Sequence, residues 1–147
     1  SGAGAWRGAW QARLGYGGQT IPWPVTAEKP FTQSQNSGMM ELDASDSEVF
    51  GVAVAPSFAR VLEIWEGSAY RSAGGVAGSV RMQVMVDGDE VWSTPSASAR
   101  QASRREHGGP VARIPVTAGK LVEFRIANTH GTPATGCAGV TYAWARP

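Results

Sequence analysis

Apolar side chains recur at every second position along most of this chain, and this period is typical of β-strands. The alternation is clearest at 79–86, where Val80, Met82, Val84 and Val86 fall on one face. Asp87-Gly88 follows directly, and such a pair is favoured in two-residue hairpin turns because both positions adopt positive φ. We therefore predict a β-hairpin whose return strand covers residues 90–94.

Further short segments have the same strand character. Residues 121–127 alternate again, and we expect Val122, Phe124 and Ile126 to face inward. Other strands are predicted at 10–16, 39–42, 49–54, 58–66, 111–116 and 140–144. Residues 68–78 are predicted to form a Gly/Ser/Ala loop, and 95–106, the best helical possibility, an ordered loop. Many short strands separated by turns predict an all-β fold, a sandwich or jelly roll.

The predicted strand at 58–66 has apolar side chains on both faces. Leu62 and Ile64 fall on one side, and Val61 and Trp65 on the other. Such a strand is either central and covered twice or part of a subunit interface. Val61 and Trp65 are therefore the candidate subunit contacts.

Size and composition limit the organisation of the chain. Its 147 residues and 15.4 kDa suit one domain. We expect a flexible N-terminal arm at 1–8 and a sandwich domain at 9–147. The net charge of +1 gives little basis for nucleic-acid binding. No apolar run approaches the roughly 18 residues that cross a bilayer, so membrane insertion is not expected.

Residues suited to catalysis are few. Cys137 is the single cysteine, and His107 and His130 are the two histidines. A Cys137 nucleophile with His130 as its base is formally possible, but no neighbouring residue in the sequence activates the thiol. Sequence motifs for a nucleophile elbow, a phosphate loop or a dinucleotide site are absent. We therefore expect a protein that is not an enzyme and carries no cofactor.

Acidic residues cluster twice. The set at 87–90 is explained by the hairpin turn, in which Asp supplies turn geometry. Asp43, Asp46 and Glu48 only loosely resemble a calcium-binding loop, since the glycine of an EF-hand is missing. An ordinary connection between strands is favoured here, and no metal site is predicted, although a calcium ion near 43–48 stays an open alternative.

Two sets of residues are candidates for contacts outside the domain. Arginine guanidinium groups bind carboxylates, sulfates and phosphates well. The densest basic stretch of the chain could therefore contact an acidic glycan or an acidic protein. The alternative is that it forms a solvated loop. Three tryptophans in irregular sequence could contact a ligand or partner, or could pack within the domain. The other tryptophans, including Trp92 and Trp144, are expected in the core or in an interface. The candidate contacts are Arg100, Arg104, Arg105, Trp6, Trp10 and Trp23.

The order of segments resembles the complement-type, tumour-necrosis-factor-like head domains found at the ends of bacteriophage tail and fibre proteins. The resemblance covers roughly residues 12–145. It rests on Ala12-Arg13-Leu14, Gln19-Thr20-Ile21-Pro22, Val25-Thr26, the strands at 49–54 and 58–65, the hairpin at 80–88, the segment 116–124 and the closing strand 139–144. Two positions depart from the family pattern: Lys120 replaces an acid, and Ser57-Phe58-Ala59 replaces Gly-x-Tyr.

This resemblance implies a jelly roll that forms a homotrimer by packing one sheet about a threefold axis. It also implies a virion structural or adhesion role, as a head fibre, a capsid decoration or a receptor-binding tip. The expected partners are further copies of the chain and other virion proteins, and a host-surface glycan is a further candidate partner. The alternative is a carbohydrate-binding module of a secreted bacterial enzyme, located outside the cell, which would be monomeric and often holds calcium. Oligomeric state distinguishes the two.

Overall fold

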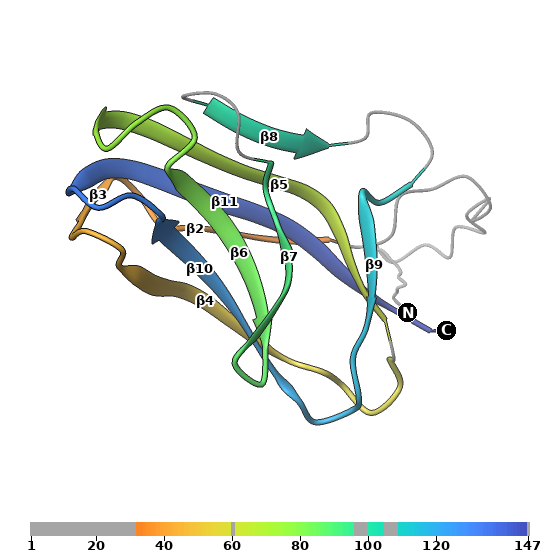
Figure 1. Cartoon of the computed structure of the whole chain (residues 1–147). Coiled ribbons are helices and arrows are strands. Elements are labelled where there is room, and N and C mark those ends of the chain that lie inside the picture. The colour runs from red at the N-terminus through yellow and green to blue at the C-terminus, as the bar shows by residue number, and fades with distance from the viewer. Residues whose placement is uncertain (1–31, 60, 96–99, 105–108, 147) are drawn as a thin grey trace.

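Two antiparallel β-sheets face each other in the computed structural model (Figure 1). The structure describes residues 32–59, 61–95, 100–104 and 109–146, and gives only the backbone of 100–104. This part of the chain contains strands and no helix, and so no helix that could cross a membrane. The all-β prediction is confirmed. The predicted arm at 1–8 and the predicted strand at 10–16 lie outside the described residues.

The first sheet has the strand order β4-β10-β6-β7. Its strands are β4 (Ser47–Val54), β10 (Leu121–Asn128), β6 (Val80–Val86) and β7 (Asp89–Ser93). The predicted hairpin joins β6 to β7, and Asp87 and Gly88 have φ angles of 52° and 85°. Positive φ at both turn positions confirms the hairpin prediction. The predicted strand at 121–127 is confirmed as well, since Val122, Phe124 and Ile126 are fully buried.

The second sheet has the order β2-β11-β5-β8. Its strands are β2 (Gln33–Asn36), β11 (Ala134–Ala145), β5 (Val61–Gly74) and β8 (Arg100–Arg104). Two short strands extend it: β3 (Met40–Leu42) pairs with β11 beyond β2, and β9 (Ala112–Pro115) pairs with β5 beyond β8.

The strand order is that of a jelly roll. β2 and β3 pair with consecutive parts of β11, and β8 and β9 with consecutive parts of β5, so each couple acts as one interrupted strand. Counted this way, the described residues form eight strands, in the orders 1-8-3-6 and 2-7-4-5. Two Greek keys wound into a double sheet produce this arrangement. The jelly-roll prediction is therefore confirmed by the connectivity itself.

The core fills the space between the two sheets. Phe124 of the first sheet and Tyr142 of the second are both buried, with ring centroids 4.9 Å apart. Met82 and Leu62 are fully buried beside them. The alternating residues that the sequence assigns to the interior are thus the residues that join the sheets.

Two loop predictions are wrong. Residues 68–74, predicted as a loop, continue β5, because their backbone pairs with β11 as far as Gly74, with one irregularity at Ser72. A Cβ atom at Gly67 would lie 2.6 Å from the Trp92 ring, so a bare glycine is needed for this strand to pack on β7. Residues 100–104, predicted within an ordered loop, form β8 because their backbone pairs with residues 66–70 of β5.

The predicted start of the strand at 58–66 is also wrong. β5 begins at Val61, and Phe58 lies in a turn, 59% exposed. The backbone N–H of Ala59 donates to the carbonyl of Pro56 at 3.1 Å, which closes the turn. Proline fixes the backbone of the first turn residue and lacks an N–H for a sheet, so pairing resumes only after it.

Candidate functional surfaces

Val61 and Trp65 lie on the outer face of the second sheet, opposite the buried Leu62 and Ile64. Both are half-buried, so the structure confirms that β5 has apolar side chains on both faces. The outer face is not wholly apolar, however. Glu63 lies between the two, and it is only 5% exposed.

Glu63 holds its neighbours in place. The Trp65 indole Nε1–H donates to Glu63 Oε1 at 3.2 Å, and Arg113 of β9 donates to Glu63 Oε2. One carboxylate therefore fixes an indole and a guanidinium side by side on the sheet face. We call Val61, Glu63, Trp65 and Arg113 the Trp65 cluster. The expectation that this face forms a subunit contact stays a prediction.

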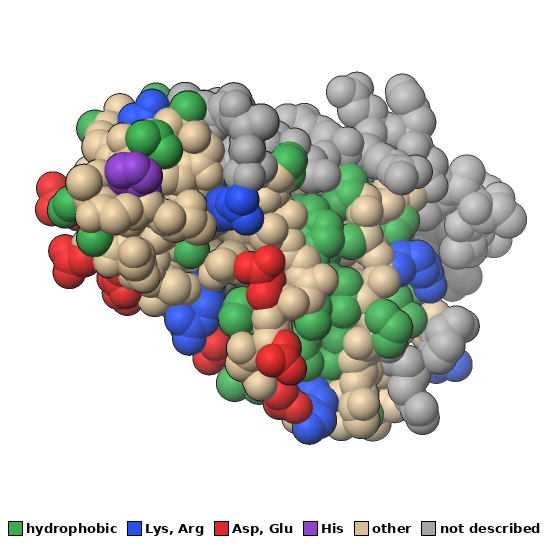
Figure 2. Space-filling model, in the orientation of Figure 1, with side chains coloured by type: hydrophobic (Ala, Val, Ile, Leu, Met, Phe, Trp, Pro, Cys, Tyr) green, Lys and Arg blue, Asp and Glu red, His purple; other side chains and the backbone are tan. Residues whose placement is uncertain are grey.

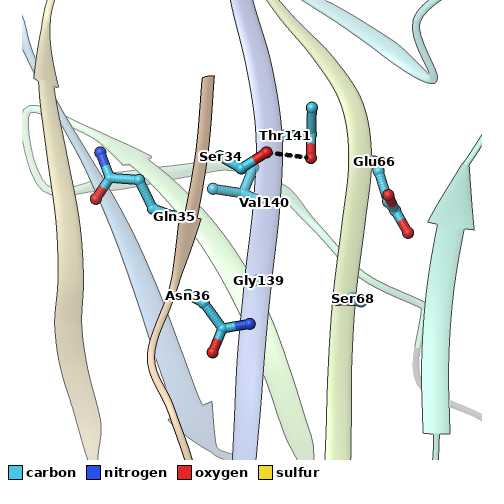
Figure 3. A pocket seen from close by; sticks show the side chains of 8 residues that line it. All are labelled: Ser34, Gln35, Asn36, Glu66, Ser68, Gly139, Val140 and Thr141. Carbon is cyan, nitrogen blue, oxygen red and sulfur yellow. Dashed lines mark hydrogen bonds between the residues drawn. The ribbon is translucent and has the colours of Figure 1, made fainter. Parts of the chain in front are cut away.

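A polar groove crosses the same face farther along the sheet (Figure 3). It has a volume of about 320 Å³ and passes over β11 between β2 and β5. It is lined by Ser34, Gln35, Asn36, Glu66, Ser68, Gly139, Val140 and Thr141. The Ser34 and Thr141 hydroxyl oxygens are hydrogen-bonded at 3.0 Å. Because Gly139 has no side chain, the centre of the groove is open down to the backbone of β11.

No pattern in the sequence indicates this groove. β2 was not predicted as a strand, and its pairing with β11 joins residues about a hundred positions apart, such as Gln35 and Val140. Polar residues at alternate positions, such as 34 and 36, are as typical of a loop as of a strand, so they predict no strand unless the partner strand is known. The groove is therefore a product of the tertiary pairing.

Exposed apolar side chains gather on the outer face of the first sheet instead. Val54 and Leu121 lie directly opposite each other on β4 and β10, and are 58% and 43% exposed. Val52, two residues along the same strand, is 52% exposed. Hydrophobic side chains also gather on the surface between β7 and β9 in Figure 2. Trp92 of β7 and Val111, just before β9, are half-buried and pack against the core. Trp144 packs against the core in the same way, as predicted.

The remaining contact candidates are only partly described. Trp6, Trp10, Trp23 and Arg105 lie outside the described residues. Arg100 and Arg104 are the end residues of β8, and their backbones pair with Tyr70 and Glu66 of β5. Arg104 therefore lies, by backbone register, beside a residue that lines the polar groove.

The acidic residues at 43–48 form a turn. The Asp46 N–H donates to the Asp43 carbonyl at 3.2 Å, and Asp46 Oδ1 accepts the Ser47 N–H at 2.8 Å. The protonated Glu48 carboxyl donates a hydrogen bond to Asp46, and this bond, together with the negative charge of Asp46, raises the pKa of Glu48 above its ordinary 4.5. Within the described ranges, no three His, Cys, Asp or Glu side chains are grouped so that they could hold a metal ion.

The two candidate catalytic residues that are described occupy ordinary positions. His130 lies between β10 and β11, with Nδ1 3.0 Å from Thr132 Oγ1. Cys137 is half-buried within β11, opposite Tyr70.

No family model and no curated protein matches this chain. Among solved structures, it is similar to the chain of the infectious bursal disease virus VP2 subviral particle, with a TM-score of 0.44 and 10% identity over 90% of this chain and 37% of that one. It is also similar to the capsid structure of Helicobacter pylori bacteriophage KHP30, with a TM-score of 0.35 and 14% identity over 80% of this chain and 95% of that one. A third similar structure is FLHE, with a TM-score of 0.33 and 11% identity over 76% of this chain and 96% of that one.

This chain spans about 37% of the length of the bursal virus chain that it matches. All these TM-scores are below 0.5. A function for this chain must therefore be argued from its own fold and surfaces.

Proposed function

We propose that this chain is a non-enzymatic structural and adhesion module of a virion that acts as a homotrimer. Its partners are further copies of itself and other virion proteins. The subunit contact is the Trp65 cluster on the outer face of the second sheet. The jelly-roll strand order supports the proposal, because it is the order that the resemblance to phage head domains implies.

The observation that carries the proposal is that Trp65 and Arg113 both bond to one buried carboxylate, that of Glu63. Trp and Arg are the residue types that most often dominate the binding energy of protein interfaces. Association normally restricts the conformations of such side chains, and this loss of conformational entropy opposes binding. Here both are already held by the Glu63 carboxylate, so a partner would meet an ordered surface. Val61 adds an apolar side chain to the same patch.

Light scattering coupled to size exclusion tests the proposal. At tens of micromolar, we expect a mass three times the 15.4 kDa of one chain. Val61→Asp or Trp65→Asp would bury an unpaired carboxylate in the contact, which is strongly unfavourable, so both variants should run as monomers.

Val54→Asp is the matched control, since it places the same charge on the outer face of the other sheet. We expect it to stay trimeric. If Val54→Asp dissociates the trimer and Trp65→Asp does not, the contact lies on the first sheet. A wild-type chain that runs as a monomer contradicts the trimer proposal.

The second candidate function is a carbohydrate-binding module of a secreted bacterial enzyme. The polar groove favours it, because hydroxyl and amide groups there surround an open floor. A monomeric wild-type chain that binds a sugar would make this the leading function.

A further inference from the structure

We infer that the outer edge of β4 pairs with the same edge of a second copy of this chain. The contact is separate from the Trp65 cluster, and it rests on the proposed function only for its role, which is to join trimers to one another in a particle. β4 is the end strand of the first sheet, with β10 on one side and no described strand on the other (Figure 1). Such an edge offers unpaired backbone groups to another strand.

The hydrogen bonds just after β4 fix which residues turn their backbone groups outward. The Ala55 N–H donates to the Lys120 carbonyl at 2.9 Å, and the Ala55 carbonyl accepts the Gly119 N–H at 2.7 Å. Ala55 therefore turns both groups toward the side of β10. Because this direction alternates from residue to residue along a strand, Val52 and Val54 turn their N–H and C=O groups away from β10.

Gln35 of β2 covers only part of this edge. Its Nε2 donates to the Val52 carbonyl at 3.4 Å, and its side chain comes from the inner face, where a Cβ atom on Gly51 would overlap it. A carbonyl oxygen has a second lone pair, so Val52 can still accept from a strand in the plane of the sheet. The other outward groups, the N–H of Val52 and both groups of Val54, have no partner among the described residues.

Two features limit the available edge to residues 51–55, which we call the β4 window. On one side, a bulge at Phe50 breaks the pairing register with β10. On the other side, Pro56 has no N–H to donate to a sheet. Between them the pairing is regular, so a second strand finds outward backbone groups only at the two valines of the window.

The β4 window is symmetric with respect to itself. Val52 and Val54 lie at equal distances in sequence on either side of Ala53. A twofold axis at Ala53 therefore places Val52 of each copy opposite Val54 of the other copy, in an antiparallel pairing. Each of the two opposed pairs exchanges two N–H···O bonds, so four donors meet four acceptors. This match of the edge with itself is the reason for choosing a second copy as the partner.

The side chains fit the same register. On the outer face Val52, Val54 and Leu121, which lies opposite Val54 on β10, are all exposed. The pairing would place Val54 between Leu121 of its own chain and Val52 of the second copy, and so remove apolar surface from water. On the inner face, positions 51, 53 and 55 are glycine and alanine, which leave room for a second strand, and the window contains no charged residue.

The contact is small and therefore weak by itself. Standard interfaces bury about 800 Å² on each partner over roughly 20 residues or more, and the β4 window has far fewer. We expect pairing at millimolar protein and not at the tens of micromolar at which the trimer is measured. Because a trimer carries three such edges, weak contacts would act together wherever trimers are concentrated on a particle.

Cysteine cross-linking tests the register of the contact. Val52→Cys and Val54→Cys are made separately, each in a Cys137→Ser background, and the two proteins are mixed at millimolar concentration and mildly oxidised. Residues opposed in a hydrogen-bonded pair have Cα atoms about 5.5 Å apart, which suits a disulfide. On a denaturing gel, the mixture should therefore give several-fold more covalent dimer than either variant alone. A mixture of Val49→Cys and Val76→Cys, two exposed valines outside the window, is the control and should show no such excess.

Val54→Pro tests the backbone bonds of the contact. It removes an N–H that faces away from β10, and proline is tolerated at such edge positions, so the β4–β10 pairing should persist. The contact loses two of its four bonds, and pairing should weaken roughly tenfold or more. Val54→Thr, which keeps the N–H and the shape of the side chain, is the matched control and should pair more strongly than the proline variant. Sedimentation equilibrium at millimolar protein measures both in a Trp65→Asp background, which lacks the trimer contact.

Either of two results would overturn the inference. One is a mixture that cross-links no more than the separate cysteine variants, and the other is equal association of the Val54→Pro and Val54→Thr variants. If the proline variant fails to fold, the cross-linking result decides alone. The trimer is measured separately, by native mass at tens of micromolar, so a failed edge contact and a failed trimer give different results.

Discussion

At Gly67, β5 lies against the Trp92 ring of the other sheet. A Cβ atom there would lie 2.6 Å from Cζ3 and 2.7 Å from Cη2 of the Trp92 ring. Gly67→Ala must therefore displace a large half-buried ring, and overpacking of this kind costs about 1–3 kcal/mol. Denaturant unfolding measures the loss. Gly131→Ala meets nothing within 4 Å and should change stability by less than about 0.5 kcal/mol; an equal loss in both variants would contradict the contact.

Glu48 gives the stability of the protein a specific dependence on pH. Its pKa in the folded protein is raised above 4.5, first by the hydrogen bond that the protonated Glu48 carboxyl donates to Asp46. At pH values around and above 4.5, the folded state therefore binds more protons than the unfolded state. The contribution of Glu48 to the free energy of unfolding then falls as the pH rises. Glu48→Gln removes this decline, so the variant should gain stability relative to wild type between about pH 4 and pH 7.

The gain is measured by denaturant unfolding at the two pH values. Glu41→Gln, on neighbouring β3, controls for the loss of one negative charge. An NMR titration that places the pKa of Glu48 at or below 4.5 would contradict the prediction.

At the scale of elements, the β6–β7 hairpin depends on its two-residue turn. Gly88 has a φ of 85°, and a Cβ atom there would meet nothing within 4 Å. The backbone angle, and not a lack of space, therefore disfavours other residues at this position. An alanine there adopts a left-handed conformation that costs about 1–2 kcal/mol. Gly88→Ala should lower thermal stability accordingly. Gly109→Ala also meets open space but does not have positive φ, and its melting temperature should match that of wild type.

An ion pair between Arg113 and Glu63 links β9 to β5 in addition to their backbone pairing. The Glu63 side chain is 7% exposed, so Arg113→Met leaves a carboxylate almost buried without its cation. The expected loss is about 1–3 kcal/mol. Lys120 and Asp87 form a pair at 2.6 Å that is about half-exposed on both sides, and Lys120→Met should cost less than about 1 kcal/mol. Measured free energies of unfolding of the two variants compare these losses. Equal losses would contradict the prediction that the buried pair stabilises the protein more than the exposed pair.

The whole molecule is held together by rings that meet between the sheets. Phe124 is fully buried and lies 4.9 Å from the Tyr142 ring and 6.5 Å from the Phe50 ring, measured between centroids. Phe124→Ala should cost about 3–5 kcal/mol, a large share of the stability of a domain this size. Phe124→Leu, which keeps most of the volume, should lose clearly less. Calorimetry checks both, and an alanine variant with wild-type stability would contradict the assigned core.

The sequence by itself determined the parts of this protein that depend on neighbouring residues. Alternation put Val122, Phe124 and Ile126 inside, and Asp87-Gly88 defined a hairpin, because side-chain direction and turn angles are local properties of the chain. These segments sufficed to predict an all-β sandwich.

The tertiary structure decided the rest. Residues 68–74 and 100–104 became strands only because a partner strand supplied hydrogen bonds, since their small and polar side chains have no apolar period. Glu63 is buried because Arg113, fifty positions away, meets it. The polar groove needs Asn36, Ser68 and Gly139 on three adjacent strands. Contacts between distant residues leave no periodic pattern along the chain, and the candidate sites of this protein are built from such contacts.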